Sequence, residues 1–329
     1  MNVYEVVRGS TSIDGLRRAE RVRPAPGPSE VLVRVRAASL NFRDIAIVRG
    51  KYIGGPLTHD TIPLSDGAGE VEAVGAGVDE FAVGDRVVAT FAQGRPPAAL
   101  GSPLDGMLTE YICLNVDGLL RVPAGLSYEE AATLPCAGVT AWNALTEGKA
   151  VRPGDTVLTL GTGGVSLFAL QIAKTAGARV IITSSSDEKL ERARALGADE
   201  TINYKREPAW ERAVLELTDG LGADHVVELG GSGTLPHSYR AVGPRGEISL
   251  IGVMTLPEGD LSPHAMMFKG ATMRGIFVGD KHLFIGLNKA IAVNGLKPVI
   301  DTVFEFDAAV EAYRYLRSAK HFGKVVIRI

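Results

Sequence analysis

The residues whose types and spacing most clearly indicate chemistry are the glycines that follow a strand-like run, Val157 to Leu160. This run leads into Gly161-Thr162-Gly163-Gly164-Val165-Ser166, and an apolar, helix-like run follows. Glycines between a strand and a helix are typical of a loop that binds the pyrophosphate of a dinucleotide. Gly161 permits a sharp turn, and Gly163 lets the backbone approach the phosphates. A helix beginning near Gly164 would present free N–H groups to them, so we predict that Gly161, Thr162, Gly163, Gly164 and Val165 bind a dinucleotide.

The end of the next predicted strand indicates which dinucleotide binds. A site for NAD places Asp or Glu there, roughly 20 residues after the glycines, on the ribose hydroxyls. This chain has Thr183-Ser184-Ser185-Ser186 instead, and its first carboxylate, Asp187, falls in the following helix. Hydroxyls and the nearby Lys189 offer the donors and positive charge that a 2′-phosphate needs. We therefore predict NADP (as NADPH) with Ser184, Ser185 and Lys189 at its phosphate.

Two alternatives to this cofactor prediction stay open. The serines form only a polar loop in which Ser186 caps the helix, or they accept NAD.

Strands and helices alternate around these segments. Six strands are predicted, over residues 156–160, 179–183, 199–204, 225–229, 247–251 and 272–277. Ser186 is expected to cap a helix that ends at Leu196, and Pro208 opens another. Six strands with intervening helices are typical of a complete doubly wound Rossmann domain, so the predicted fold class is α/β with a parallel sheet.

The first 120 residues or so form a different pattern. Short strands are predicted over residues 30–37, 69–74, 86–89 and 109–114, with a loop over 92–106 and no long helix, which is typical of a small closed β-domain. A capping box over 127–130 begins a helix. The tail is expected to hold a helix over 280–294, a helix capped by Asp307 and a last strand over 324–329. Because such a tail is too short to form its own core, the last strand should return to the β-domain.

Composition excludes several classes of protein. The chain has 329 residues, a net charge of −3, 46% hydrophobic and 22% charged residues, so neither nucleic acid nor a membrane is an expected partner. Cys113 and Cys136 are too few for a disulfide framework or a zinc ribbon. The N-terminus has no apolar core of signal-peptide length, and glycines interrupt the uncharged stretch 156–173. We expect a cytoplasmic protein.

Several stretches resemble the medium-chain dehydrogenase/reductase superfamily. They are Gly67-Ala-Gly69-Glu, Val83-Gly-Asp85-Arg-Val, the segment 131–142, the segment 171–178 and the closing His321-Phe-Gly323-Lys324-Val-Val. The resemblance implies a GroES-like β-domain made from residues 1–124 and 269–329, a Rossmann domain over 125–268 and an active site in the cleft between them. It also implies a homodimer or homotetramer joined through the edge of the Rossmann sheet. We expect that edge at 272–277, where proline at Ile276 should remove a ladder donor and break the dimer.

The same resemblance shows where zinc ligands would stand. Zinc-dependent members carry a Cys, a His-Glu pair and a second Cys; this chain has Asn41, Ser65-Asp66 and Cys136. One thiol cannot build a catalytic zinc site, which needs about three protein ligands. The region 92–113 also lacks the four spaced cysteines of a structural zinc. The chain thus resembles the zinc-independent, quinone oxidoreductase-like branch, and we expect no zinc.

Residues 41–52 carry the candidate catalytic groups. That branch has Asn-x-x-Asp followed by tyrosines, which Asn41, Asp44 and Tyr52 match. Asn41 would donate a hydrogen bond to the substrate, Tyr52 would donate a proton to the developing oxyanion, and Arg43 would supply charge near the absent metal. Asn41 can equally be a turn residue at a strand end and Tyr52 a loop aromatic. For Arg43, an ion pair with Asp44 or Asp66 is the favoured alternative.

The resemblance also suggests cofactor contacts. In similar proteins, Lys189 and Tyr204 reach the 2′-phosphate, and the nicotinamide is held by Thr140, Ile251, Gly252, Phe277 and Val278.

Hydride transfer requires the protein mainly to position the cofactor against the acceptor. Without a metal, nothing polarises a simple carbonyl as a Lewis acid, whereas a quinone or enone spreads the charge onto an oxygen that needs only a hydrogen-bond donor. We therefore predict a zinc-independent, NADPH-dependent reductase acting on a quinone or an α,β-unsaturated carbonyl compound. Two alternatives remain: a metal-free alcohol or aldehyde dehydrogenase, and an NADPH-binding protein without turnover, similar to the crystallin relatives of this branch.

Overall fold

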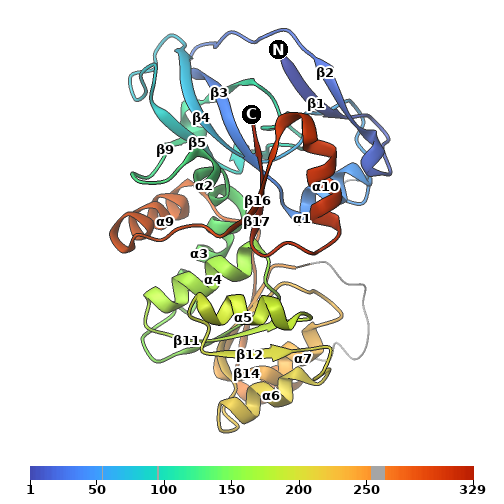
Figure 1. Ribbon diagram of the computed structural model, residues 1–329. Coiled ribbons are helices and arrows are strands. Elements are labelled where there is room, and N and C mark those ends of the chain that lie inside the picture. The colour runs from blue at the N-terminus through green and yellow to red at the C-terminus, as the bar shows by residue number, and fades with distance from the viewer. Residues whose placement is uncertain (54, 95, 253–263) are drawn as a thin grey trace. The chain divides into compact units, whose positions relative to one another are not determined.

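The chain forms two compact units (Figure 1). The structure, a computed structural model, describes residues 1–53, 55–94, 96–252 and 264–329. One unit combines the two ends of the chain, Met1–Val139 and Asp280–Ile329, and the other is Thr140–Gly279. Both boundaries lie further along the chain than the expected 124/125 and 268/269. The first differs because helix α2 (Tyr128–Ala132) packs against the β-rich unit.

The unit Thr140–Gly279 is built on one six-stranded parallel sheet. In spatial order its strands are β12 (Glu200–Asn203), β11 (Arg179–Ser184), β10 (Thr156–Thr159), β13 (Ala223–Glu228), β14 (Val242–Leu250) and β15 (Thr272–Gly275). This order is that of two mononucleotide-binding halves side by side. All six predicted strands are therefore confirmed. The central strands β10 and β11 are buried at every residue after their first, as strands covered on both faces are expected to be.

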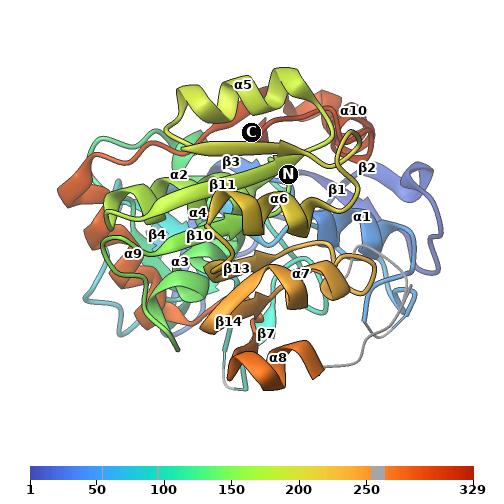
Figure 2. The same ribbon diagram turned by 90° about the horizontal axis from the view of Figure 1, so that it is seen from below.

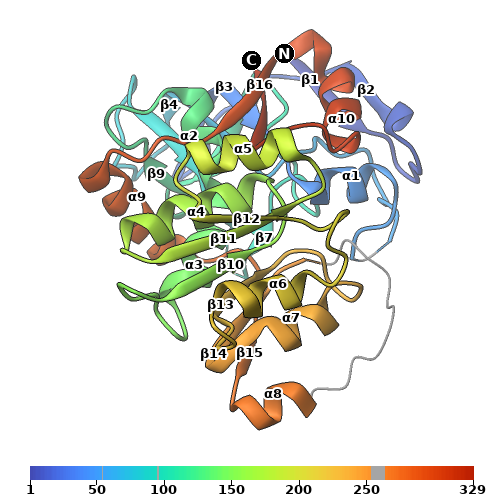
Figure 3. The same ribbon diagram turned by 60° about the horizontal axis from the view of Figure 1, so that its bottom comes forward.

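Helices cover both faces of this sheet. The pair α4 (Gly164–Thr175) and α5 (Asp187–Ala195) lies on one side, and the pair α6 (Trp210–Leu217) and α7 (Leu235–Ala241) lies on the other (Figures 2 and 3). Two further helices are α3 (Val139–Thr146), which leads into the sheet, and α8 (His264–Lys269), which packs on β14.

The β-rich unit holds a seven-stranded sheet. Its strands are β16 (Ile300–Glu305), β17 (Lys324–Arg328), β3 (Glu30–Ser39), β4 (Asp66–Val74), β5 (Arg86–Ala89) and β9 (Leu119–Arg121) in spatial order, with β8 (Tyr111–Asn115) also paired to β3. The last strand, β17, runs antiparallel to β3 with Ile327 opposite Ala38, so red and blue ribbons lie together in Figure 1. The expected return of the C-terminus to this unit is confirmed.

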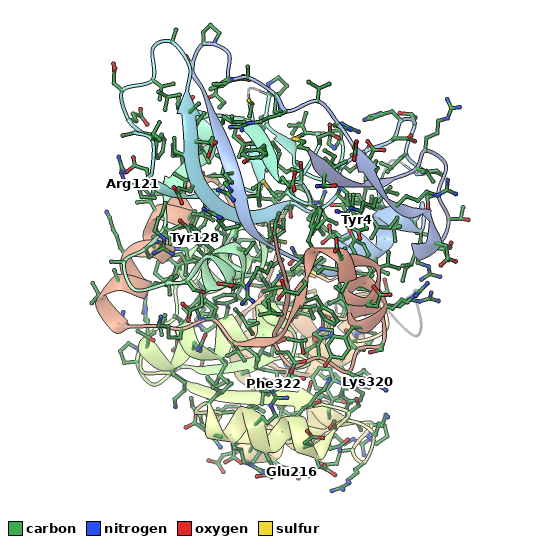
Figure 4. All side chains as sticks on the ribbon, turned by 45° about the horizontal axis from the view of Figure 1, so that its top comes forward. Tyr4, Arg121, Tyr128, Glu216, Lys320 and Phe322 are labelled. Carbon is green, nitrogen blue, oxygen red and sulfur yellow. The ribbon has the colours of Figure 1, made fainter. Side chains whose placement is uncertain are left out.

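The β-rich unit also contains two hairpins and two helices from the C-terminal segment. Two small hairpins are β1 (Asn2–Val6) with β2 (Leu16–Glu20), and β6 (Ala92–Gln93) with β7 (Ala98–Ala99). Helix α9 (Lys281–Asn294) begins where predicted, with the Asp280 side chain accepting a hydrogen bond from the Leu283 N–H group at 2.9 Å. Helix α10 (Ala309–Arg317) places Tyr313 in the core. Figure 4 shows Phe322, also buried, in the segment that leads into β17.

Three expectations about this unit were wrong. Helix α1 (Phe42–Val48) was not predicted. Its seven residues include an Arg and an Asp that are buried in the structure, so the sequence lacks the apolar pattern of a buried helix face. The expected loop 92–106 contains β6 and β7. Asp307 does not cap α10: it lies in a 3-10 turn, and its carboxylate accepts a hydrogen bond from Arg18 at 2.7 Å. No helix within the described ranges is long and apolar enough to cross a lipid bilayer.

Candidate active site

The glycine loop has the geometry of a phosphate-binding turn. Helix α4 begins at Gly164 with Gly163 as its N-cap, as predicted. Gly161 has φ +77°, a conformation that other residues adopt only with strain. A Cβ atom at Gly161 or Gly163 would meet no described atom within 4 Å. The backbone of the loop is therefore open to a ligand beside the first N–H groups of α4.

Ser166, which replaces the third glycine of the pattern, has a structural role. Its side chain is fully buried, and its hydroxyl donates a hydrogen bond to the Leu160 carbonyl oxygen at 2.8 Å. On the other side of the loop, the Thr183 hydroxyl accepts a hydrogen bond from the Gly161 N–H at 3.2 Å. Both contacts join the glycine loop to the ends of strands, so the serine keeps helix and strand close without a glycine.

The candidates for the 2′-phosphate gather at the carboxyl ends of β11 and β12. Ser184 is buried, and its hydroxyl accepts a hydrogen bond from the Ser186 N–H at 3.3 Å, while Ser185 is half-buried. Ser186 caps α5 by accepting from the Lys189 N–H at 3.4 Å, so the capping interpretation holds for this serine. The Tyr204 N–H donates to the Ser184 carbonyl oxygen at 3.1 Å, and this places the exposed tyrosine beside the serine loop.

The nearest carboxylate at this edge is already engaged. Asp187 accepts a hydrogen bond from the Asn203 amide at 2.7 Å and forms an ion pair with Arg206. Arg206 was not selected from the sequence, although the run Tyr204-Lys205-Arg206 was the available signal. The carboxylate that could have bound ribose hydroxyls is therefore bound to an exposed cation.

The candidates for the nicotinamide follow the last two strands. The N–H groups of Ile251 and Gly252 both donate to the Glu228 carbonyl oxygen at 3.0 Å. A Cβ at Gly252 would lie 1.7 Å from the Leu229 carbonyl oxygen, so only glycine fits there. Thr140 is buried in the first turn of α3.

Two further candidates continue from β15. Phe277 is 68% exposed. Val278 has φ +54°, and its carbonyl oxygen accepts a hydrogen bond from the Asn143 amide at 2.7 Å. Asn143 thus holds a strained turn at the end of the sheet, a role that the sequence did not indicate.

In the β-rich unit, a buried lysine lies among the candidate catalytic residues. Lys324 is 3% exposed, and its ammonium donates hydrogen bonds to Asn41 Oδ1 at 2.6 Å and to the Leu40 carbonyl oxygen at 2.7 Å. The Asp66 carboxylate lies 3.8 Å from the same ammonium. In the sequence, Lys324 is recognisable only as part of a family motif, and no local pattern indicates this contact.

Asp66 is itself fully buried and well supplied with donors. Its carboxylate accepts hydrogen bonds from the hydroxyls of Ser65 (2.7 Å) and Ser39 (3.3 Å) and from the Cys136 N–H (3.3 Å). Burial, and then the charge of Asp66, raise the pKa of the Cys136 thiol well above its ordinary value. The structure therefore brings Asn41, Asp66 and Cys136 together around Lys324, with the thiol protonated.

Arg43 has contacts different from those of Lys324. Its guanidinium donates to the carbonyl oxygens of Leu100 (2.9 Å) and Ser102 (3.1 Å) and lies over the Tyr52 ring, 5.0 Å from the ring centroid. Its Nη1 lies 3.9 Å from Asp44 Oδ1, so the ion-pair interpretation with Asp44 is the one that the geometry favours. Nε of Arg43 also donates to the Tyr52 hydroxyl at 3.4 Å.

Comparison with known proteins agrees with this architecture. Residues 27–124 match the model described as alcohol dehydrogenase GroES-like domain, and residues 164–293 match the one described as zinc-binding dehydrogenase. A zinc-type alcohol dehydrogenase-like protein of Schizosaccharomyces pombe is 47% identical over 317 residues, covering 92% of this chain and 91% of the relative. The chain belongs to the medium-chain dehydrogenase/reductase superfamily. It is therefore an NAD(P)H-dependent oxidoreductase with a GroES-like unit and a Rossmann unit.

The descriptions of other similar proteins name different substrates and cofactors. A quinone oxidoreductase of Pseudomonas aeruginosa is 40% identical, covering 75% of this chain and 72% of the relative. A crystal structure described as an NAD-dependent alcohol dehydrogenase is 36% identical, with a TM-score of 0.93 and full coverage of both chains. The mycobacterial protein Rv1454c, solved in complex with NADPH, is 29% identical, with a TM-score of 0.85 and full coverage of both chains.

Zinc, which two of these descriptions name, does not fit the residues present. Catalytic zinc is held by about three thiolate, imidazole or carboxylate ligands. At the corresponding place this chain has a single thiol, a carboxylate with three hydrogen-bond donors, and an amide oxygen that already accepts from Lys324. A resident ammonium also repels a divalent cation. Within the described ranges, no group of three or more His, Cys, Asp or Glu residues is arranged to hold a metal.

Proposed function

We propose that the protein is a zinc-independent, NADPH-dependent reductase of quinones or α,β-unsaturated carbonyl compounds. The observation that carries this proposal is the contact between Lys324 and Asn41, 2.6 Å long, at the place where zinc-dependent members of the superfamily hold their metal. A site with an amide and an ammonium, and without a Lewis acid, suits acceptors that delocalise the incoming charge.

The cofactor proposal rests on the carboxyl edge of β11 and β12. Lys189, Tyr204 and Arg206 lie there, and the first carboxylate after the serines, Asp187, is engaged by Asn203 and Arg206. Cations and hydroxyls at this place favour a 2′-phosphate over free ribose hydroxyls. NADPH, when bound, supplies the hydride. The protein's own part is then to bind the phosphates at the glycine loop and to stabilise the acceptor oxygen.

The first test is the oxidation of NADPH by chelator-treated protein, with an ortho-quinone or an enal as acceptor and NADH run in parallel. We expect turnover that survives chelation and is faster with NADPH than with NADH. Loss of activity after chelation, restored by zinc, would overturn the zinc-independent proposal. A preference for NADH would overturn the cofactor proposal alone.

A second candidate is a metal-free alcohol or aldehyde dehydrogenase. The names of the S. pombe relative and of the NAD-dependent structural neighbour favour it. Alcohol oxidation with NADP⁺ or NAD⁺ in the presence of chelator, together with no reduction of quinones or enals, would select this candidate. Tight NADPH binding without turnover of any acceptor would instead select a binding protein.

We also propose a cytoplasmic location and a homodimer joined through the edge of the Rossmann sheet. Cys113 and Cys136 are both free thiols, which a reducing compartment would preserve. Among the described strands, β15 is the last of its sheet and pairs only with β14. A second copy would extend the sheet there.

A further inference from the structure

Lys324 is a buried cation whose charge is compensated by its neighbours. One of these neighbours, Asn41, keeps a side-chain nitrogen without a hydrogen-bond acceptor among the described residues. Burying an ammonium is unfavourable unless hydrogen bonds and an opposite charge compensate the loss of hydration. Leu40 and Asn41 supply two oxygen acceptors, and Asp66 supplies the charge at 3.8 Å. The ammonium is therefore a resident part of the unit that holds Asn41.

The contact with Lys324 determines how the Asn41 amide is turned. An ammonium has only donors, so the amide atom 2.6 Å from Nζ must be the oxygen. The amide nitrogen Nδ2 then faces away from Lys324. This nitrogen is buried and has no acceptor among the described residues. A buried donor without an acceptor is destabilising, so such donors are rare unless a ligand accepts their hydrogen bond.

We propose that Lys324 is a positioning residue, which holds the Asn41 amide with Nδ2 as the donor to the substrate oxygen. This inference rests on the proposed function. In the reaction, the acceptor takes up a hydride at carbon, its conjugated electron pair moves onto the oxygen, and the oxygen later takes a proton from water. Nδ2 stabilises the negative charge that develops on that oxygen before the proton arrives.

The decisive experiment is a double-mutant cycle between Lys324 and Asn41. The variants are Lys324→Met, Asn41→Leu and the double variant, with kcat and KM measured for NADPH and an ortho-quinone. Loss of one oxyanion donor typically lowers kcat by about 10²-fold or more. We expect such a loss in each single variant, no further loss in the double variant, and an unchanged KM for NADPH. An equal loss from Lys324→Met in both backgrounds would overturn the proposal, because Lys324 would then act independently of Asn41.

Two controls separate positioning from folding. Lys320→Met makes the same substitution at an exposed lysine four residues earlier in the same segment, labelled in Figure 4, and should leave kcat unchanged. Asn41→Asp keeps an oxygen for Lys324 and adds a charge partner, but it replaces the Nδ2 donor with an oxygen. This variant should therefore fold with an unchanged Tm and still lose kcat. An active Asn41→Asp variant would contradict the assignment of Nδ2 as the donor.

A binding measurement separates this inference from the proposed function. The probe is 4-nitrophenolate, an aromatic oxyanion whose absorbance changes when a donor binds its oxygen, titrated in the presence of NADP⁺. We expect Kd to rise about tenfold or more in Asn41→Asp and Lys324→Met and to stay constant in Lys320→Met, in line with the loss of a hydrogen bond to a charged group. This result would support Lys324 even if no quinone or enal were reduced. Equal affinities in all four proteins, or no binding to the wild type, would overturn the inference.

Discussion

Nζ of Lys324 lies 2.6 Å from Oδ1 of Asn41, although 283 residues separate them in the chain. The pairing of β17 with β3 brings them together: Val326 is opposite Ser39, so Lys324 falls beside Leu40 and Asn41. Arg328, further along β17, forms an ion pair with Glu129 of α2. The last strand therefore supplies a site residue as well as an element of the sheet.

Arg43 is expected to stabilise the fold rather than act on the substrate. In Arg43→Met, the carbonyl oxygens of Leu100 and Ser102 lose their donors, and the buried Asp44 loses its nearest cation. Removing one partner of a buried ion pair costs about 3–5 kcal/mol, and we expect urea unfolding to show a loss of this size. The exposed Arg17→Met should change the free energy of unfolding by less than about 0.5 kcal/mol. Unchanged stability with a lost kcat in Arg43→Met would instead place Arg43 in catalysis.

Asp44 should make the stability of the protein depend on pH in the acidic range. Burial raises the pKa of Asp44 from 3.8 to about 6, although Arg43 and the Asn41 N–H oppose this shift. Between these two pH values the folded protein holds a proton that the unfolded chain has released. The free energy of unfolding should therefore fall as pH rises from 4 to 6, by about 3 kcal/mol in total, and this contribution should then stay constant.

The variant Asp44→Asn tests this dependence, because its amide does not titrate. The free energy of unfolding should be measured with urea at pH 4.5 and pH 7.5. From the lower to the higher pH, the value for the wild type should fall relative to the value for Asp44→Asn. Asp307→Asn removes an exposed carboxylate, whose side chain is 75% accessible, and serves as the control. A constant difference between wild type and Asp44→Asn at the two pH values would show that Asp44 titrates normally.

The sequence predicts the Rossmann unit better than it predicts the β-rich unit. Its glycine loop, its six strands and the Ser186 cap depend on residues close together in the chain. Helix α1 was missed because Arg43 and Asp44 look exposed in the sequence and are buried in the structure. The role of Lys324 depends on a strand pairing across almost the whole chain, and no local pattern reports such a pairing.

Lys189 should determine the preference for NADPH. A hydrogen bond to a charged group contributes about 1.5–3 kcal/mol, so Lys189→Ala should raise KM for NADPH about tenfold or more and leave KM for NADH unchanged. Lys174→Ala, which removes a lysine paired with Asp199 on the same unit, should change neither. Arg206→Ala should have a smaller effect than Lys189→Ala, because Asp187 already neutralises part of that charge. An equal rise in KM for NADPH and NADH in Lys189→Ala would show that the lysine stabilises the fold or binds the pyrophosphate instead.

The structure changes how the proposed dimer should be tested. Proline at Ile276 was expected to break the dimer, but the Ile276 N–H donates to the Leu250 carbonyl oxygen at 2.9 Å within the same chain. That substitution would therefore damage the sheet of each protomer. Since N–H groups alternate in direction along a strand, Met273 and Gly275 are the residues of β15 whose N–H groups face away from β14.

Met273→Pro is thus the substitution that should separate the two copies. Met273 is 42% exposed, and proline there removes an outward donor while β14 and β15 keep their own hydrogen bonds. Light scattering should give the mass of a dimer for the wild type and of a monomer for Met273→Pro, with unchanged far-UV circular dichroism. Ile276→Pro should instead lower Tm. A wild-type protein with the mass of a monomer, or a Met273→Pro variant with the mass of a dimer, would show that this edge does not join two copies.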